Sequence, residues 1–350
     1  MINYLHPQVQ EDLKELTEQN LPWAALENKT VLITGATGML ASYVGFTLLY
    51  LNEHLNLNIK PVFLARSQEK LNQVYGNSIN NVHGLVQDVC EPINYSGTID
   101  YIFHAAGAAS PYFILNDPVG IINANVQGTQ NILELARSSN TKNIVFASTR
   151  EIYGRVEGKL NITETDMGVL DPLDPRSCYP ESKRLAETLF MAYYTQHKVN
   201  FNALRIAHTY GPGMQIEGDG RVMSDLINDV VNKRDIHLKS TGEAERAFCY
   251  ITDAISGIFR VMLQGEPATA YNLANELEPI RIIDLANLLQ KIANNGKSVK
   301  VETDKSNQAG YTNYKRTALD SSRLNALNWQ PVVELKDGLE KTLKAFGEKL

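Results

Sequence analysis

Residues 30–45 read TVLITGATGMLASYVG and give the strongest indication of how this chain folds. The apolar run 31–33 predicts a buried parallel strand, and the glycine-rich turn after it opens an apolar helix. Gly35 permits the tight turn, Gly38 lets the backbone approach a pyrophosphate, and the small Ala41 allows close helix packing. The helix would present its first N–H groups and its positive dipole end to phosphates. The stretch therefore predicts a dinucleotide site, with a plain strand–turn–helix as the alternative.

Two later stretches carry a pattern typical of proton transfer: STREIYG at residues 148–154 and YPESK at residues 179–183. Tyr179 and Lys183 are four residues apart, so they share one face of a helix. The ammonium would stabilise a phenolate and lower the tyrosine pKa, which makes Tyr179 a usable general base. Thr149 could complete a relay that takes a proton from a substrate alcohol. An exposed helix face is the alternative, but the dinucleotide turn upstream favours catalysis.

The bulk composition is that of an ordinary globular protein. The chain has 350 residues, a net charge of −6 and a pI near 5.7, and its basic residues are scattered, so we expect no nucleic-acid partner. No apolar run has the length of a membrane span, and the N-terminus has no signal pattern. The three widely spaced cysteines indicate reduced thiols rather than a disulfide or metal framework. We therefore expect a cytoplasmic protein without a metal site.

Strand and helix patterns alternate along the first two thirds of the chain. We expect a helix within residues 8–27, and strands at 31–33, 61–65, 82–86, 101–107, 143–148 and 202–207. Strands separated by helices predict an α/β fold with a doubly wound parallel sheet, which binds ligands at the strand C-termini. We predict an N-terminal helical extension over 1–28 and a dinucleotide-binding domain over 29–176. A smaller α/β substrate-binding region over 177–350 would return some elements to the sheet and carry a short strand near 298–302.

Six further motifs point to a family: HAAGAASP (104–111), NVQGTQN (125–131), DPRSCYPESKR (174–184), YGPGM (210–214), DGRV (219–222) and RAFCYITD (246–253). In this order the chain resembles the extended short-chain dehydrogenases that act on nucleotide sugars. The resemblance spans about residues 29–345 and is closest to UDP-glucuronate decarboxylases. It implies a nucleotide-sugar substrate, a nicotinamide dinucleotide cofactor, and a role in surface polysaccharide synthesis.

The resemblance also implies a reaction that begins with oxidation of the sugar C4 hydroxyl. Tyr179 would take the hydroxyl proton while hydride passes to the nicotinamide, and Thr149 would hydrogen-bond the same oxygen. Lys183 would hold the nicotinamide ribose, and Glu151 matches a working glutamate of related decarboxylases and dehydratases. A 4-keto group acidifies C5–H and makes a C6 carboxylate a β-keto acid that loses CO2 easily. The cofactor then acts as an internal hydride store.

The resemblance assigns further residues to each ligand. His104 is more typical of a packed residue than of a catalyst. For the arginines, surface ion pairs are the alternative; for Glu151 it is a helix cap, and for Asp88 a loop-closing role. The expected cofactor-binding residues are Gly35, Thr37, Gly38, Met39, Leu40, Arg66, Asp88, Val89, Ala105, Ala106 and Gly107, together with Tyr179 and Lys183, and the expected substrate-binding residues are Arg150, His208, Arg221, Arg246 and Arg316.

Three positions depart from the family pattern. Arg150 stands where dehydratases have an aspartate acid and decarboxylases usually a serine, which weakens simple 4,6-dehydration. Its guanidinium could instead pair a carboxylate or phosphate bidentately. His208 replaces an asparagine that many relatives place near the diphosphate. The second strand ends in Arg66 with no acidic residue, which hints at NADP, whereas the closest relatives retain NAD. We favour NAD, with NADP as the alternative.

The function predicted from these features is that of an NAD(P)-dependent nucleotide-sugar enzyme, most like a UDP-glucuronate decarboxylase. The alternatives within the family are a 4-epimerase and a 4,6-dehydratase or ketoreductase. A non-catalytic dinucleotide-sensing scaffold is the alternative of a different class, and the intact Tyr179, Lys183 and Thr149 argue against it. The resemblance also implies a homodimer, formed through the long helices at 125–137 and 179–196 as a four-helix bundle.

Overall fold

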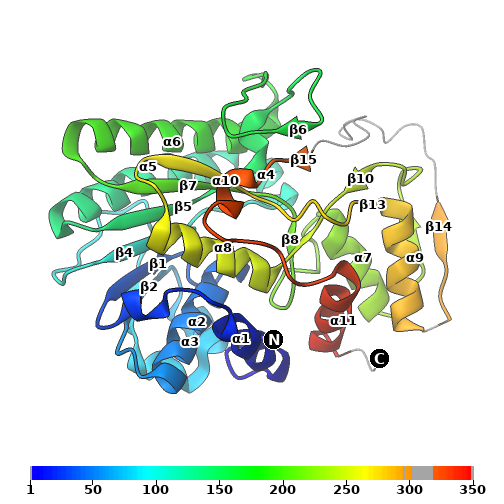
Figure 1. Cartoon of the computed structure of the whole chain (residues 1–350). Helices are drawn as coiled ribbons and strands as arrows, with labels where there is room; N and C mark the ends of the chain where they lie inside the picture. The colour runs from blue at the N-terminus through cyan, green and yellow to red at the C-terminus, as the bar shows by residue number, and fades with distance from the viewer. Residues whose placement is uncertain (1, 295, 302–317, 348–350) are drawn as a thin grey trace.

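A parallel sheet of seven strands organises the part of the chain that the computed structural model describes, namely residues 2–294, 296–301 and 318–347 (Figure 1). Its strand order is β12-β7-β5-β4-β1-β2-β3, and every neighbouring pair is parallel. This order confirms the doubly wound fold that the sequence predicts. The strands are β1 (Thr30–Thr34), β2 (Lys60–Ala65), β3 (His83–Val86), β4 (Tyr101–His104), β5 (Asn143–Thr149), β7 (Phe201–Ile206) and β12 (Thr269–Leu273).

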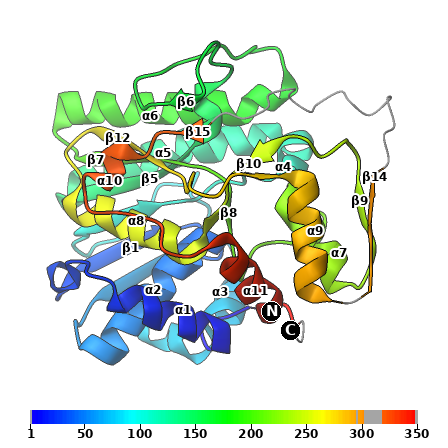
Figure 2. The same ribbon diagram turned by 45° about the vertical axis from the view of Figure 1, so that its right-hand side comes forward.

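Both faces of the sheet are buried. Successive strand residues point to opposite sides of the sheet, and on β1 they enter two different cores. Val31 and Ile33 pack in one core with helices α2 (Met39–Leu55) and α8 (Ile251–Gln264). Leu32 packs in a second core with helices α5 (Pro118–Ser139) and α6 (Cys178–His197). In Figures 1 and 2, α5 and α6 lie above the sheet, and α2 lies below it with α3 (Gln68–Tyr75).

The N-terminal segment forms helix α1 (Pro7–Glu18) and the short helix η1 (Trp23–Leu26). Val9, Leu13 and Leu16 of α1 are fully buried. Helix α1 packs against α2, α8 and α11 (Leu335–Ala345), and the two described ends of the chain lie close together (Figure 2). A buried carboxylate, Asp12, accepts hydrogen bonds from the Tyr43 and Tyr250 hydroxyls at 3.0 and 2.9 Å. The extension is therefore an integral part of the core.

Strand β12 is absent from the sequence predictions. It pairs with β7 in register from Thr269 opposite Asn202 to Leu273 opposite Ile206. A polar residue, Asn272, interrupts the apolar pattern by which an inner strand is recognised. Asn272 can be fully buried because its amide donates hydrogen bonds to the carbonyls of Ile162 and Asp320. The seventh strand therefore depends on side-chain hydrogen bonds to distant segments.

Four small two-stranded sheets flank the main one, and none of them is predicted as a pair. Strands β8 (Thr209–Tyr210) and β11 (Cys249–Tyr250) pair beyond the carboxyl end of β7. Helices α7 (Val222–Val231) and α9 (Ile282–Ala293) and strand β14 (Val299–Val301) gather at one side of the molecule (Figure 1). The pairs are β6 (Asn161–Ile162) with β15 (Ala318–Leu319), β8 (Thr209–Tyr210) with β11 (Cys249–Tyr250), β9 (Ile236–Leu238) with β14 (Val299–Val301), and β10 (Glu245–Arg246) with β13 (Ile280–Arg281). The remaining helices are η2 (Gly76–Asn81), α4 (Pro111–Asn116), η3 (Arg150–Tyr153), η4 (Pro175–Ser177), α7 (Val222–Val231), α9 (Ile282–Ala293) and α10 (Ser322–Asn325).

The three cysteines, Cys90, Cys178 and Cys249, are free thiols, as the sequence indicates. Within the described ranges, every helix is too short or too polar to cross a membrane. The division into an extension, a dinucleotide-binding domain and a substrate-binding region stays a prediction.

Candidate active site

The turn after β1 has the backbone that a phosphate site needs. Gly35 has φ +65°, and a Cβ there would lie 2.9 Å from the Ala105 carbonyl oxygen, so no larger residue fits. Gly38 precedes the first residue of α2, and no side chain of the described residues caps this helix end. Its first N–H groups and its dipole are therefore directed at the space in front of the turn. The residues fit the pyrophosphate of a dinucleotide.

The first residues after β4 form the second wall of this cradle. Thr34 Oγ1 accepts hydrogen bonds from the backbone N–H groups of Ala105 and Ala106, each at 3.1 Å. It also lies 2.7 Å from His104 Nδ1. His104 is fully buried, and burial lowers its pKa to about 3, so the ring is neutral. His104 is thus a packed residue, as the sequence indicates, and it joins β4 to β1.

Gly107 brings the same loop against the long helices. It has φ +140°, and a Cβ there would lie 2.8 Å from Asn125 Oδ1. Asn125 Nδ2 in turn donates to Ser182 Oγ at 2.9 Å. Asn125 therefore links the predicted cofactor loop to α6, the helix of Tyr179, a role that sequence reasoning missed.

The predicted adenosine end of the cofactor site carries one cation, Arg66 for the ribose, and one carboxylate, Asp88 for the adenine. Arg66 is exposed just beyond β2, and its charge helps to lower the pKa of Asp88, whose main cause is a hydrogen bond from the Cys90 N–H. That bond, at 2.9 Å, closes a local turn. Val89 is buried against Gly128, where a Cβ would lie 2.8 Å from Val89 Cγ1. Asp88 thus has the loop-closing role at least, and Arg66 remains available to a ribose or its phosphate.

Tyr179, Lys183 and Thr149 come together where β5 ends beside the first turn of α6. The Thr149 side chain lies close enough to the Tyr179 hydroxyl to act on its pKa as a hydrogen-bond partner. Lys183 Nζ donates to the Ala147 carbonyl at 2.8 Å and lies 4.4 Å from the centre of the Phe146 ring. Tyr179 and Lys183 are only 6% and 4% exposed, so the pair is no solvated helix face. The relay predicted from sequence has its residues in place.

The electrostatics of the pair differ from the prediction in one respect. Burial raises the pKa of Tyr179, and the negative charge of Glu151 adds to this effect, against the Thr149 hydrogen bond and the charge of Arg221. The ammonium of Lys183 is not among these causes, and burial lowers its own pKa to about 7. The expected lowering of the tyrosine pKa is therefore wrong for this state. Tyr179 is a phenol, and it needs further positive charge nearby to act as a base.

Glu151 is the second residue of η3 and follows Thr149 by two positions. Its backbone N–H donates to Thr149 Oγ1 at 3.2 Å, so the hydroxyl that lies near Tyr179 also caps this short helix. The Glu151 carboxylate lies 4.0 Å from Arg176, and its side chain is 42% exposed. Surrounding protein nonetheless raises its pKa, against the charges of Arg176 and Arg150. A carboxyl group in this setting can exchange protons with a substrate.

A buried network behind the site was missed by the sequence reasoning. Ser148 Oγ donates to Glu187 Oε1 at 2.5 Å, and Arg205 pairs with both oxygens of Glu187, at 3.2 and 2.7 Å. Arg205 Nη1 also donates to the Tyr153 hydroxyl at 3.0 Å. Two signals could have revealed it: Glu187 is four residues after Lys183 on the same helix face, and Arg205 interrupts an apolar strand. The network thus holds Ser148, which precedes Thr149, and Tyr153, at the end of η3.

Three of the predicted substrate residues form one basic cluster. Arg150 Nη1 donates to His208 Nε2 at 2.6 Å. Burial, together with the charges of Arg150 and Arg246, lowers the pKa of His208 well below its usual range, so the imidazole is neutral. Burial and then the charge of Arg150 lower the pKa of Arg246. Two guanidinium groups thus lie near one neutral ring, an arrangement suited to an anion.

The other two predicted substrate arginines have different outcomes. Arg221 lies close enough to Tyr179 to affect its pKa, but its guanidinium pairs with both oxygens of Asp219, at 2.5 and 2.9 Å. Arg221 thus forms an ion pair, which was the alternative to substrate binding that the sequence left open. Arg316 lies outside the described residues.

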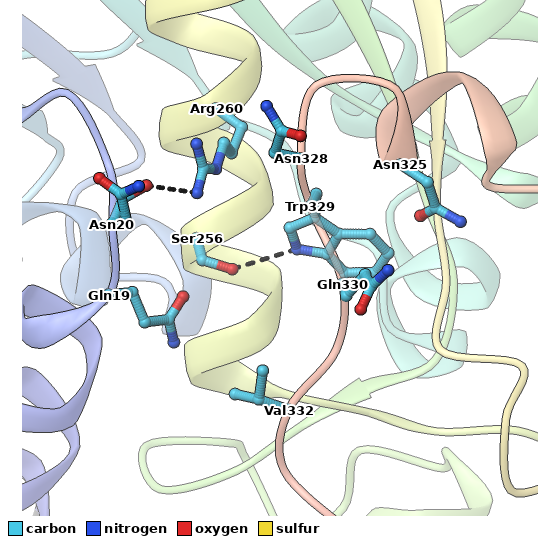
Figure 3. Close-up of a pocket in the computed structure, with 9 residues that line it drawn as sticks. All are labelled: Gln19, Asn20, Ser256, Arg260, Asn325, Asn328, Trp329, Gln330 and Val332. Carbon is cyan, nitrogen blue, oxygen red and sulfur yellow. Dashed lines mark hydrogen bonds between the residues drawn. The ribbon is translucent and has the colours of Figure 1, made fainter.

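A polar pocket of about 410 Å³ lies away from these residues (Figure 3). Amide side chains line it together with Arg260, which donates to the Asn20 carbonyl at 2.5 Å. Trp329 Nε1 donates to Ser256 Oγ at 3.1 Å beneath it. Next to Arg260 on α8, the carbonyls of Val261 and Met262 accept hydrogen bonds from Asn143 Nδ2, at the start of β5. This pocket therefore lies at the amino ends of the strands. It is not the catalytic cleft of this fold.

Comparison with known proteins agrees with this geometry. Residues 31–274 match the model of the NAD dependent epimerase/dehydratase family. UDP-glucuronic acid decarboxylase 6 of Arabidopsis thaliana is 31% identical over 89% of this chain and 87% of its own. The UDP-glucose 4-epimerase of Thermotoga maritima, solved with UDP-glucose, has a TM-score of 0.76 at 21% identity, covering 91% of this chain and 98% of its own. The NAD complex of UDP-glucuronic acid 4-epimerase from Bacillus cereus has a TM-score of 0.71 at 21% identity, covering 91% and 96%.

The solved structures share the fold, and the curated relative shares sequence along most of both chains. The match to the family model and the identity to the curated relatives confirm the resemblance found in the sequence. The chain belongs to the NAD dependent epimerase/dehydratase family.

Proposed function

We propose that this chain oxidises UDP-glucuronate at C4 and releases its C6 carboxylate as CO2. The Thr149 hydroxyl beside the buried Tyr179 and Lys183 carries the first half of this proposal, because a proton acceptor and an orienting hydroxyl would then meet at one substrate oxygen. The second half is supported by relatives that are UDP-glucuronic acid decarboxylases.

The cofactor is a nicotinamide dinucleotide held by the turn at Gly35 and Gly38 and by the wall at Ala105. When bound, it supplies a hydride acceptor and, in its oxidised form, a positive charge near the site. That charge is what a buried Tyr179 needs to become a base. We propose NAD as the cofactor; Arg66 keeps NADP as the alternative, and separate titrations with the two dinucleotides decide between them.

The protein groups then move protons around the substrate. Tyr179 accepts the C4 hydroxyl proton while Thr149 holds the same oxygen, and the C4 hydrogen leaves as hydride. In the resulting β-keto acid the C5–C6 bond breaks, CO2 leaves, and the electron pair stays on the sugar as an enolate. A proton from Glu151, whose raised pKa suits it as an acid, or from water then reaches C5. Return of the hydride and of the Tyr179 proton to the C4 carbonyl gives a UDP-pentose.

One observation favours a second candidate, 4-epimerisation of an acidic nucleotide sugar. Loss of CO2 removes a negative charge, so a guanidinium that pairs with the carboxylate stabilises the acid and opposes its loss. Arg150 lies next to Thr149 and is therefore placed for such a pairing. In an epimerase the ketone would be reduced on its other face, and Glu151 would be a bystander. A 4,6-dehydration is disfavoured, because a guanidinium does not deliver the proton that a leaving hydroxyl needs.

Incubation of the purified protein with UDP-glucuronate and NAD, followed by mass spectrometry, tests the proposal. Decarboxylation yields a nucleotide sugar lighter by one CO2. An unchanged mass with a new chromatographic peak identifies the epimerase. An unchanged substrate refutes both.

We also propose that the protein is a homodimer that joins α5 and α6 of two copies as a four-helix bundle. These helices lie side by side on one face of the molecule (Figure 1). They and the adjacent α4 expose apolar side chains: Tyr112, Phe113, Leu115, Val119, Ile122, Leu185 and Met191. Sedimentation of the wild type against a variant with Leu185→Glu and Met191→Glu tests this interface, because the charges would separate the copies.

A further inference from the structure

The basic cluster lies where three segments end at the same edge of the sheet. Arg150 directly follows β5, and His208 follows β7, its neighbour, with Thr149 in register with Ile206. Strand β8 then pairs with β11, so the His208 carbonyl accepts from the Cys249 N–H at 3.1 Å. This pairing brings strand β10, which ends in Arg246 three residues before Cys249, toward the histidine. Contacts distant in sequence therefore assemble the cluster.

The backbone at His208 is held in an unfavourable conformation. Its φ is +33°, in the left-handed region that residues other than glycine, asparagine and aspartate seldom adopt. Such strain persists only where the surroundings enforce it, and it concentrates at functional sites. Here the backbone bond to Cys249 and the ring contact with Phe248, 5.7 Å between centroids, hold the residue. The result is an imidazole fixed with Nε2 toward Arg150.

The protonation state makes His208 a positioning residue. Its ring is neutral, and Nε2 accepts from Arg150, so the imidazole orients the guanidinium without adding charge. Protonation of the ring would end this hydrogen bond, and burial, together with the charges of the two neighbouring arginines, opposes it. Burial lowers the pKa of Arg150, and the charges of Glu276 and Glu151 oppose this lowering. The guanidinium is therefore charged and held in one direction.

We infer that Arg150, oriented by His208, forms with Arg246 a subsite for an anionic group on the substrate sugar, the carboxylate of an acidic nucleotide sugar. The inference rests on the C4 oxidation of the proposed function, in which the reacting hydroxyl lies at Tyr179 and Thr149, and it holds whether the acid is then decarboxylated or epimerised. Because Arg150 is bonded in sequence to Thr149, it lies at the sugar rather than at the distant nucleotide. A guanidinium pairs with a carboxylate in two parallel hydrogen bonds, which a neutral hydroxymethyl group cannot match.

The test measures binding without turnover, in a Tyr179→Phe background. Calorimetry compares UDP-glucuronate, UDP-glucose and UDP as ligands of the parent and of Arg150→Ser, the residue that decarboxylases usually carry. We expect Arg150→Ser to weaken UDP-glucuronate by about tenfold to a hundredfold, the range of a lost charged hydrogen bond, and to leave UDP-glucose and UDP within about twofold. Arg234→Ala is the matched control: this arginine is 52% exposed beyond the end of α7, pairs with Asp229, and should change none of the three affinities.

Two further variants keep the test decisive. His208→Asn retains a residue that tolerates positive φ but removes the ring acceptor, and it should weaken UDP-glucuronate selectively and by less than Arg150→Ser. Arg150→Lys keeps the charge without the fork; it should lose most of the preference, and it serves in place of Arg150→Ser if that variant does not fold. An equal loss for all three ligands would assign Arg150 to the diphosphate, and no loss would make it structural; either result overturns the inference.

The outcome is separable from that of the proposed function. Preference for UDP-glucuronate that depends on Arg150, without CO2 release by the wild type, would refute decarboxylation and keep the acidic-sugar subsite. Release of CO2 with an affinity for UDP-glucuronate that does not depend on Arg150 would do the reverse.

Discussion

Glu187 is the residue whose replacement tests the buried support of the site most sharply. Its carboxylate holds Arg205 through two contacts, at 3.2 and 2.7 Å, and accepts from Ser148, and the two charged side chains are only 14% and 6% exposed. Removing one partner of a buried ion pair leaves the other charge uncompensated, which costs about 3–5 kcal/mol. Glu187→Gln keeps the volume and one acceptor, so we expect a loss of about 3 kcal/mol in the free energy of unfolding.

Urea denaturation measures this loss against a matched variant on the same helix. Glu181→Gln breaks a pair with Arg184 whose atoms lie 3.5 Å apart and whose side chains are 39% and 26% exposed, so we expect about 0.5 kcal/mol or less. A double variant, Glu187→Gln with Arg205→Met, should lose less than the two single changes together, because no charge is then left alone. If Glu187→Gln destabilises no more than Glu181→Gln, the network does not support the fold.

The same change has a catalytic readout, because Glu187 also acts on Lys183. Burial lowers the pKa of Lys183 to about 7, and the Glu187 charge opposes that lowering. The amine is charged below its pKa and loses the charge above it, so without Glu187 the charge is lost at a lower pH. The alkaline limb of the kcat profile should therefore move to lower pH in Glu187→Gln. An unmoved limb would show that Lys183 does not set it.

Three more predictions concern other parts of the molecule. Tyr179→Phe should lower kcat by about a hundredfold to ten-thousandfold while dinucleotide binding, followed by calorimetry, stays unchanged; equal turnover would remove Tyr179 from the reaction. Gly35→Ala should abolish dinucleotide binding, since its Cβ would lie 2.9 Å from the Ala105 carbonyl at a positive φ, and normal binding would contradict this steric limit. Asp12 has a pKa raised by burial from 3.8 to about 6, so its folded state favours the protonated form and the stability from this group is lost as the pH rises through that value. Asp12→Asn should remove a decline of roughly 3 kcal/mol between about pH 4 and pH 7 in urea denaturation, and an unchanged decline would assign it to other groups.

Local patterns predicted the frame of the fold because the inner strands are apolar and short. The turn at Gly35, the strands β1 to β5 and strand β7 follow from such runs. Strand β12 could not be found in this way, since its buried Asn272 is satisfied by carbonyls far away in the chain. Helix α1 has the apolar spacing that predicts it, but the role of Asp12 depends on Tyr250, 238 residues distant.

The site shows the same division between local and distant information. The spacing of Tyr179 and Lys183 is a property of one helix, so it could be predicted from sequence. The directions in which their pKa values shift could not be predicted, because burial depends on the whole fold. Arg150 and His208 stood out as departures, yet their 2.6 Å contact arises from strand neighbours and from the pairing of β8 with β11. Arg221 needed only its neighbour Asp219, two residues away, to be recognised as an ion pair.

Oxidation at C4 is the central claim, and a single turnover tests it most directly. The protein, loaded with NAD and in excess, is mixed with UDP-glucuronate while the absorbance of reduced nicotinamide is followed, and the quenched mixture is analysed by mass spectrometry. We predict a transient absorbance that rises and decays as a product lighter by one CO2 accumulates, with Tyr179→Phe showing neither. A product that forms without any reduced nicotinamide, or with equal speed in Tyr179→Phe, would contradict a reaction that begins with hydride transfer from C4.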